Sequence, residues 1–176
     1  MAGPLKSGKI QSKVNLAKKR FAIVVAEWND DVTDALYESA VASLKSHGVK
    51  AENILKKTVP GTFELSLAAL WMGEKKDIDA IICLGCVIQG ETPHFDFVAG
   101  EAARGATQAS LQSGVPVLFG VITADTVKQA VDRCGSRSAN KGYEAAMAAI
   151  EVVNLYRRMD SEQGLKGKEK KFSHGI

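Results

Sequence analysis

Four short apolar runs, each separated from the next by a segment of helix length, limit most strongly what this chain can fold into. The runs lie at 21–26, within 51–61, at 79–88 and at 115–123. Runs rich in β-branched residues are typical of parallel strands that are buried on both faces. The other segments predict helices, at about 30–46, 63–73, 93–113, 125–133 and 140–159. Strands that alternate with helices predict an α/β fold: a three-layer α/β/α sandwich, in which a flavodoxin-like four-stranded parallel sheet has helices on both faces.

Single residues predict where these helices begin and end. We expect Asp30 or Asp31 to cap the first helix and Gly48 to stop it. Pro93 suits the first turn of the third helix, and Asp125 is expected to cap the fourth.

The charge of the chain is concentrated at its two ends. The net charge is +3, yet residues 1–20 hold six Lys or Arg and no acid, and residues 157–176 hold six against three acids. We therefore divide the chain into a basic N-terminal tail at 1–19, a folded domain at 20–158 and a flexible C-terminal tail at 159–176. Basic tails can bind nucleic acid, but apart from Phe172 no aromatic residue is available to stack on bases. Solvated ends are the preferred interpretation, and nucleic acid is not an expected partner.

The composition also bears on location and cofactors. No apolar stretch reaches the length of a bilayer span and the first 20 residues lack a signal-peptide core, so we expect no membrane insertion and a cytoplasmic location. Cys83, Cys86 and Cys134 are an odd number, which favours reduced thiols over disulfides. Cys83 and Cys86 fall on opposite faces of one strand and cannot readily share a metal. Since neither a zinc set, a GxGxxG nor a P-loop motif occurs, we predict no metal and no cofactor.

The loops that follow the strands are where a ligand is expected, because parallel sheets bind ligands outside the carboxyl ends of their strands. Trp28, after the first strand, can offer an aromatic face to a planar ligand, and the backbone near Gly61 can bind its edge. A partly buried anchor for the first helix is an equal alternative for Trp28.

The stretch "GETPHFDF" (90–97) follows the third strand. Gly90 permits close backbone approach, and Thr92 with the amides at the helix entrance forms an anion site that the helix dipole favours. His94 stands beside it with a side chain suited to proton transfer. The alternative is that His94 only forms a hydrogen bond in the first helical turn. Glu91 would repel a phosphate, so it either points outward or pairs with a cation such as Arg133.

The stretch "DRCGSRSANKGYEA" (132–145) gathers charged residues between the last two helices. Arg133 could clamp a phosphate, and Lys141 could hold an anion or a carbonyl oxygen. Arg137 and Glu144 lie in the same stretch. The alternative is that these charges only cap two helices at a surface turn.

The chain resembles the lumazine synthases over roughly residues 20–157. The resemblance is carried by "EWND", "VPGTFEL", "GCVIQGETPHFDFV", "GVPVLFGVIT" and "DRCGSRSANKGYEAAMAAIEVVNL", in the family's order and spacing. It implies the penultimate step of riboflavin biosynthesis. That step condenses 5-amino-6-(D-ribitylamino)uracil with 3,4-dihydroxy-2-butanone 4-phosphate to 6,7-dimethyl-8-ribityllumazine, with loss of phosphate and water and without a metal or organic cofactor.

The resemblance also implies the roles of individual residues. It makes His94, Arg133 and Lys141 catalytic, with His94 as the general acid/base. The substrate-binding positions that it implies are Trp28, Asn29, Thr62, Phe63, Glu64, Cys86, Val87, Ile88, Glu91, Thr92, Phe119, Arg133, Lys141 and Glu144. Of these, Phe119, Arg133 and Lys141 resemble residues that reach the site from a neighbouring subunit, and Glu144 resembles the acid that orients the cations.

The family assembles as pentamers or as hollow shells of twelve pentamers. The short turn "GSRSANKG" resembles the shell-forming members, so we expect a homo-oligomer, a pentamer or a 60-subunit shell with shared active sites. Association with riboflavin synthase is a further expectation. The sequence departs from the usual pattern at four positions, namely Ser66, Gln89, Glu91 and Arg137.

Three other functions stay open at this point. The chain could be an archaeal-type riboflavin synthase of the same fold, a non-catalytic flavin-binding module that uses Trp28, or a structural cage whose basic tails capture nucleic acid. The "GETPHF" and "NKG" segments favour a lumazine synthase over the first of these. Intact residues at every matched loop argue against a purely structural role.

Overall fold

The computed structural model of the chain describes residues 15–75, 77–136 and 139–162. Most of each predicted tail, and Arg137, lie outside the described residues. The extents of the two tails and of the 20–158 domain therefore stay predictions.

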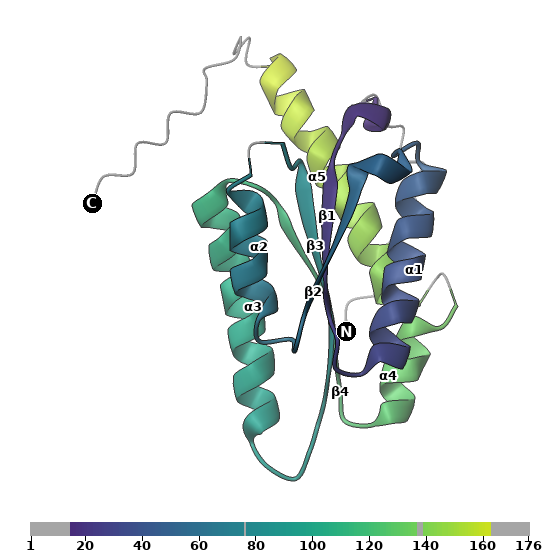
Figure 1. Ribbon diagram of the computed structural model, residues 1–176, viewed down its shortest axis with the longest axis vertical. Helices are drawn as coiled ribbons and strands as arrows, with labels where there is room; N and C mark the ends of the chain where they lie inside the picture. The colour runs from purple at the N-terminus through teal and green to yellow at the C-terminus, as the bar shows by residue number, and fades with distance from the viewer. Residues whose placement is uncertain (1–14, 76, 137–138, 163–176) are drawn as a thin grey trace, which may run out of the picture.

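The four predicted strands form one parallel sheet (Figure 1). They are β1 (Phe21–Ala26), β2 (Ile54–Val59), β3 (Ala80–Ile88) and β4 (Val117–Ala124), in the order β2-β1-β3-β4. Every neighbouring pair is parallel, with Phe21 opposite Ile54 on one side and Ala80 on the other. The predicted four-stranded parallel sheet is thus confirmed.

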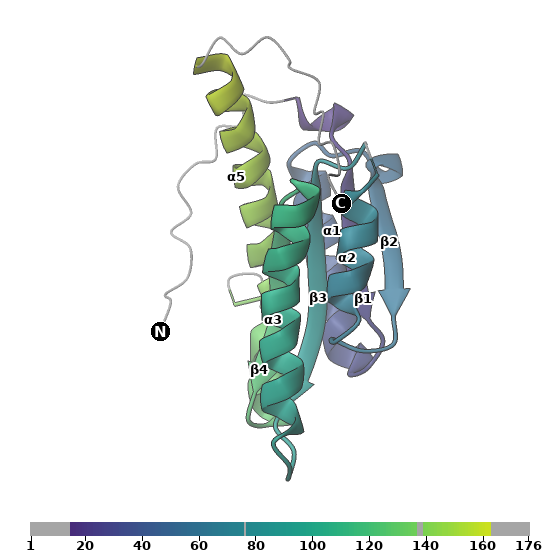
Figure 2. The ribbon, with the colours of Figure 1, turned by 90° about the vertical axis from the view of Figure 1, so that its left-hand side faces the viewer.

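Helices cover both faces of this sheet, which confirms the three-layer sandwich (Figures 1 and 2). α2 (Leu65–Gly73) and α3 (His94–Ser113) lie on one face, and α1 (Asp30–Ser46), α4 (Val127–Cys134) and α5 (Lys141–Glu162) lie on the other. Two short 3₁₀ helices, η1 (Leu16–Lys18) and η2 (Ala51–Asn53), precede β1 and β2.

Side chains alternate along each strand and so divide the core into two halves. Ile23 and Val25 of β1 belong to the cluster under α1, α4 and α5, whereas Ala22 and Val24 belong to the cluster under α2 and α3. Cys86 lies in the first cluster and Cys83 in the second, as their spacing predicts.

Two predicted helix caps are wrong by one residue. α1 is preceded by Asn29, whose carbonyl oxygen accepts from the amides of Val32 and Thr33, and neither Asp30 nor Asp31 is the cap. α4 is capped by Thr126, which accepts from the amide of Gln129, whereas Asp125 binds only the Gln129 side chain.

The start of the described chain packs against the folded body. Leu16 is buried in the core, and the side-chain amide of Asn53 donates to the carbonyl oxygen of Ala17. Lys19 forms an ion pair of 2.5 Å with Asp79. Residues 15–19, assigned above to the basic tail, therefore contribute contacts to the domain.

Two glycines allow helices to approach closely. A side chain at Gly142 of α5 would overlap with the main-chain carbonyl of Leu36 in α1. A side chain at Gly105 of α3 would overlap with the hydroxyl of Ser66 in α2, which itself donates to the carbonyl oxygen of Ala102.

We predict that Gly142→Ala lowers the free energy of unfolding by about 1–3 kcal/mol, because the added methyl group must push α1 and α5 apart. The matched control is Gly100→Ala in α3, where an added Cβ would meet no atom within 4 Å. Alanine at that helical position should raise stability by about 0.5–1 kcal/mol. Urea unfolding at one fixed protein concentration measures both changes, and equal effects would contradict the packing argument.

Candidate active site

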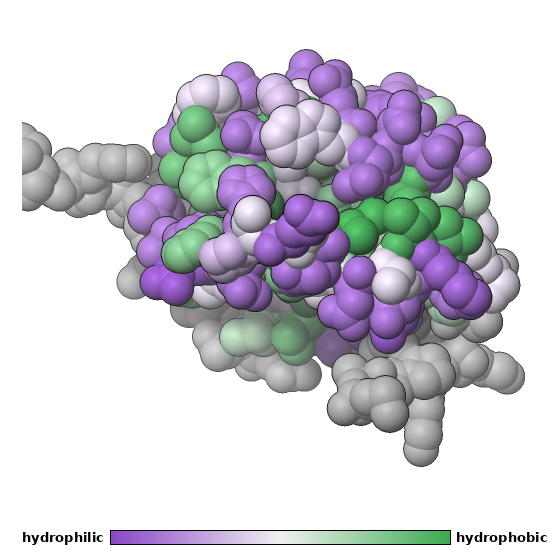
Figure 3. Space-filling model, turned by 90° about the horizontal axis from the view of Figure 1, so that it is seen from below, coloured by the Kyte–Doolittle hydropathy of each residue, from purple (hydrophilic) through white to green (hydrophobic). Residues whose placement is uncertain are grey.

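The most favourable place for a ligand lies between the carboxyl ends of β1 and β3. These strands are neighbours in the sheet, but β1 leads into α1 on one face and β3 leads into α3 on the other. Adjacent strands whose connections leave in opposite directions open a crevice that binds ligands in sheets of this kind. The carboxyl ends point down in Figure 1, and Figure 3 looks directly onto them, where separate hydrophobic patches lie within a largely hydrophilic surface.

Trp28 lies on the β1 side of this crevice, with its indole against Gly61. A Cβ built on Gly61 would lie 3.2 Å from Cε3 and 3.3 Å from Cζ3 of the indole, so a side chain at position 61 would require the indole to shift by a few tenths of an ångström. The side chain is 66% exposed, which fits a stacking platform better than a buried helix anchor. The carboxylate of Glu64 accepts from the Gly61 amide at 3.0 Å and so helps to hold this loop in place.

Asn29 connects the β1 loop to the end of β3. Its side-chain amide nitrogen Nδ2 donates to the carbonyl oxygen of Cys86 at 3.0 Å. Cys86 and Val87 are buried at the carboxyl end of β3, and Ile88 is half-buried. The carboxyl end of β3 is therefore tied directly to the loop that carries Trp28.

Two of the predicted site residues after β2 differ in exposure. Phe63 is 55% exposed, but Thr62 is only 3% exposed. A Cβ at Gly85 of β3 would lie 2.7 Å from the Thr62 hydroxyl oxygen, so the threonine side chain fills space that glycine leaves open. A ligand in the crevice can therefore meet Thr62 only through its backbone.

The loop from Gln89 to Pro93 is exposed and leads directly into α3. The amide of Gln89 donates to the carbonyl oxygen of Ala124 at 2.8 Å, which ties the start of the loop to the end of β4. Thr92 is exposed beside the first turn of the helix. Glu91 is also exposed and, among the described residues of the single chain, has no ion pair.

His94 is the first residue of α3, and its side chain is exposed. In the described part of the chain, its imidazole forms no hydrogen bond or ion pair. The alternative of a histidine bonded within the first helical turn is therefore not what the structure has. An unbonded imidazole beside a helix N-terminus is available to exchange protons with a bound ligand.

The described charged residues of the 132–145 stretch lie on the face of the sheet opposite α3. Lys141 forms an ion pair of 2.5 Å with Glu144 in the first turn of α5. Arg133 is exposed in the last turn of α4 and has no ion-pair partner among the described residues. Phe119, 41% exposed, lies on the edge strand β4. The chain therefore ties the loop of Trp28 and Asn29 to the end of β3, which leads to His94, but it places Arg133 and Lys141 in the helical layer opposite α3.

Asn140 is a residue of this region that sequence reasoning missed. It is buried, donates from Nδ2 to the carbonyl oxygen of Cys134 at 2.6 Å, and accepts at Oδ1 from the amides of Gly142 and Tyr143. It thereby joins the end of α4, which carries Arg133, to the start of α5. The available signal was an asparagine directly before a predicted helix, a favoured capping residue.

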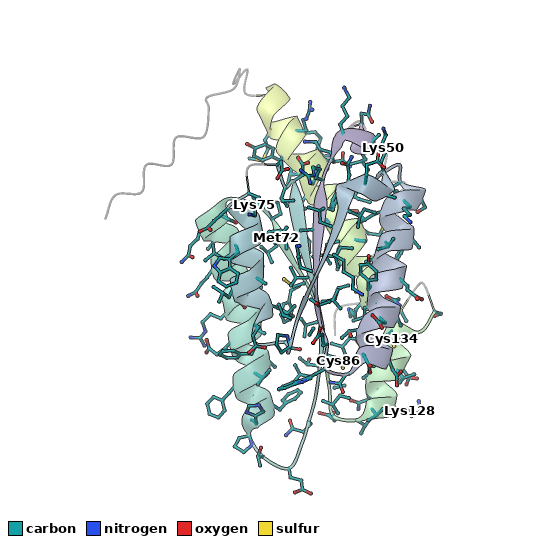
Figure 4. The ribbon with its side chains drawn as sticks, in the orientation of Figure 1. Lys50, Met72, Lys75, Cys86, Lys128 and Cys134 are labelled. Carbon is teal, nitrogen blue, oxygen red and sulfur yellow. The ribbon has the colours of Figure 1, made fainter. Side chains whose placement is uncertain are left out.

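The three thiols lie in the interior and are free. Burial raises the pKa of Cys83 to about 12. Burial, with a smaller contribution from the nearby Cys134 thiol, raises the pKa of Cys86 to about 11. Burial also raises the pKa of Cys134. Figure 4 shows Cys86 and Cys134 in the half of the molecule that holds the carboxyl ends of the strands.

Two searches of the described ranges bear on other functions. In residues 15–75, 77–136 and 139–162, no three His, Cys, Asp or Glu side chains are grouped so that they could hold a metal ion. Nor is any helix within those ranges both long and apolar enough to cross a membrane.

Comparison with known proteins gives one consistent family. The sequence model of the family described as 6,7-dimethyl-8-ribityllumazine synthase matches residues 18–157. A protein of that name from Cytophaga hutchinsonii is 52% identical over 139 residues, which cover 79% of this chain and 87% of that protein. Proteins of the same name from Bacteroides fragilis and Desulfatibacillum aliphaticivorans are 51% and 47% identical, over 77% and 83% of this chain and 95% and 94% of their own lengths. The matched residues include every site residue described above.

The buried thiols give a testable prediction, because thiolates and not thiols react with iodoacetamide. A pKa of about 11 leaves roughly one Cys86 in a thousand ionised at pH 8, against about a quarter for a free thiol. Mass spectrometry should therefore find all three cysteines unmodified after brief treatment of the folded protein at pH 8, and all three modified in guanidinium. Rapid modification of Cys86 in the folded protein would contradict its burial.

Proposed function

The chain belongs to the 6,7-dimethyl-8-ribityllumazine synthase family, and we propose that it carries out the family's reaction in the crevice between β1 and β3. The reaction condenses 5-amino-6-(D-ribitylamino)uracil with 3,4-dihydroxy-2-butanone 4-phosphate and releases phosphate and water. It is the penultimate step of riboflavin biosynthesis, and the chain is an enzyme of the transferase class. No finding favours the three other functions considered above.

The observation that carries this proposal is an exposed indole, that of Trp28 after β1, together with an unbonded imidazole, that of His94 after the neighbouring strand β3. A pyrimidine stacked on the indole has its edge toward the backbone of residues 86–88 and 62–64. Backbone amides and carbonyls there can pair with the donors and acceptors of the ring. Phe63 and Glu64 continue the same side toward the ribityl chain, and Glu64 keeps the Gly61 loop in place.

The phosphate of the second substrate binds at the entrance of α3. Amides of the Gly90–Thr92 segment and the Thr92 hydroxyl surround the helix N-terminus, where the helix dipole favours an anion. The Glu91 carboxylate opposes phosphate binding, but its exposed position lets water screen it.

His94 then stands where protons must move. The amine of the pyrimidine attacks the ketone, and the resulting carbinolamine loses water to give an imine once its oxygen is protonated. Removal of a proton from carbon then expels phosphate, and ring closure with loss of a second water gives the lumazine. An imidazole can both donate and accept these protons near neutral pH, and holding the two substrates together supplies much of the remaining rate.

We propose that a neighbouring copy completes each site with Phe119, Arg133 and Lys141. The support is their position in the chain: Arg133 and Lys141 lie in the helical layer opposite α3, and Phe119 is exposed on the edge of the sheet. Glu144, 2.5 Å from Lys141, fixes that cation in the orientation in which it meets the neighbour's substrate. Arg133 is free to pair with the phosphate in fork geometry.

The family's substrates are small molecules, and its members act as assemblies of several copies. We propose the 60-subunit shell for this chain, on the short turn between α4 and α5. Large apolar side chains that a single chain leaves exposed support assembly; they are Phe63, Leu67, Trp71, Phe97, Leu111, Phe119, Val127, Val131, Leu155 and Met159. We further propose a cytoplasmic location, which the three free cysteines support, and riboflavin synthase as a partner that consumes the product.

The direct test mixes the purified protein with both substrates and follows lumazine absorbance together with phosphate release. We predict protein-dependent formation of both products, and a loss in kcat on the order of 10²-fold in His94→Ala because proton transfer is removed. His47→Ala is the matched control, since His47 lies at the far end of α1 and binds only Ser43 and Ser46. If the protein does not accelerate the spontaneous reaction, the proposed function is wrong; equal activity of both variants would remove His94 from the mechanism.

Sharing of sites between copies predicts complementation. His94→Ala and Lys141→Ala assemblies should each have low activity, but mixing equal amounts, dissociating and reassembling them should restore wild-type pairs at about one quarter of the sites. Native mass spectrometry verifies that the subunits have exchanged. Proven exchange without recovered activity would show that His94 and Lys141 act within one chain.

A further inference from the structure

One hydrogen bond crosses the crevice between β1 and β3, from Nδ2 of Asn29 to the carbonyl oxygen of Cys86. We propose that Asn29 is a positioning residue for the pyrimidine substrate: it holds the Trp28 platform and the Cys86–Val87 peptide at a fixed separation across the crevice. This inference rests on the proposed function and assigns Asn29 a role through its neighbours, in addition to contact with the ribityl chain.

The backbone of Asn29 has an unusual conformation. Its φ is 61° and its ψ is 49°, and among the described residues it is the only non-glycine residue with a positive φ. A non-glycine residue held in this region is strained, although asparagine tolerates it better than most. Such a conformation persists when surrounding contacts impose it, so the contacts of Asn29 indicate the role of this conformation.

The Asn29 side chain does not perform the usual task of an asparagine at a helix start. An asparagine before a helix ordinarily accepts from an amide of the first turn. Here the main-chain carbonyl of Asn29 accepts from Val32 and Thr33, while the side chain makes no cap bond. The carboxamide instead points away from α1 and across to β3. The left-handed backbone therefore separates two tasks, with the main chain starting the helix and the side chain binding the next strand.

The bond to Cys86 takes the place of missing pairing between the two strands. The β1–β3 ladder ends at Val25 and Leu84, so the last residues of β3 have no main-chain partner on β1. On the other side, the amides of Glu27 and Trp28 donate to the carbonyl oxygens of Val59 and Pro60 at 2.9 and 3.2 Å. The loop at residues 27–29 is thus tied to the β2 side by two main-chain bonds, and to β3 by the Asn29 side chain.

Loss of this bond should affect one substrate selectively. Without it, the loop that carries Trp28 is held only from the β2 side, and the carbonyl of Cys86 loses its donor. Both changes concern the surfaces between which the pyrimidine lies. The phosphate-binding loop has a separate attachment, from the Gln89 amide to Ala124, and should keep its position.

The chain has two tryptophans, Trp28 and Trp71. The test compares Asn29→Gly and Asn29→Asp in a Trp71→Phe background, so that Trp28 is the tryptophan that remains. Glycine keeps the left-handed backbone and deletes the carboxamide, whereas aspartate keeps the shape but turns a carboxylate toward the Cys86 carbonyl. We expect both variants to fold and to raise the KM for the ribityl-aminouracil by about 5- to 10-fold, the effect of one lost hydrogen bond. The KM for the dihydroxybutanone phosphate should stay within about twofold. The fluorescence anisotropy of Trp28 in the substrate-free protein should fall.

A residue that only starts α1 would behave differently. Glycine is nearly as good as asparagine at a helix cap, so both KM values and the anisotropy would then stay unchanged in Asn29→Gly. That result, or an equal rise of both KM values, would overturn the proposal. If the unsubstituted protein makes no lumazine, the proposed function fails, and the proposal for the pyrimidine fails with it; the anisotropy still decides separately whether Asn29 fixes Trp28.

Discussion

The right-handed sense of β-α-β connections determines where this molecule can bind a ligand. Because β2 lies on one side of β1 and β3 lies on the other, right-handed connections place α1 on one face of the sheet and α2 and α3 on the opposite face. The chain therefore leaves the carboxyl ends of β1 and β3 in opposite directions. The loops that leave these two ends carry Trp28, Asn29 and the segment that leads to His94.

The sheet also separates residues that have different chemical roles. Groups suited to stacking and proton transfer lie along the crevice and on the α3 side, whereas the exposed Arg133 and the Lys141–Glu144 pair lie on the α4 and α5 side. A sheet with helices on both faces separates its two helical layers by roughly 20 Å, since each layer packs about 10 Å from the sheet. This separation is consistent with the proposal that two copies of the chain supply the two sets of groups.

Much of this arrangement could be predicted from the sequence because it depends on local periodicity. The strands and helices, and the opposite faces of Cys83 and Cys86, follow from spacing alone. The caps of α1 and α4 were misplaced because two or three adjacent residues, such as Asp125 and Thr126, are all good caps, and the choice depends on where the backbone turns. The burial of Thr62 could not be predicted either, because it depends on Gly85, 23 positions along the chain, which leaves space for the hydroxyl. The bond from Asn29 to Cys86 is equally non-local.

The close helix contacts at Gly142 and Gly105 also limit how the sequence can evolve, and they do so differently. The obstacle to a side chain at position 105 is the Ser66 side chain, so a smaller residue at position 66 could make room for alanine at 105. The obstacle at position 142 is the main-chain carbonyl of Leu36, which every residue type at position 36 possesses. No single compensating substitution exists there. Position 142 can accept a side chain only if the whole α1–α5 contact moves, so it should stay glycine while its surroundings diverge.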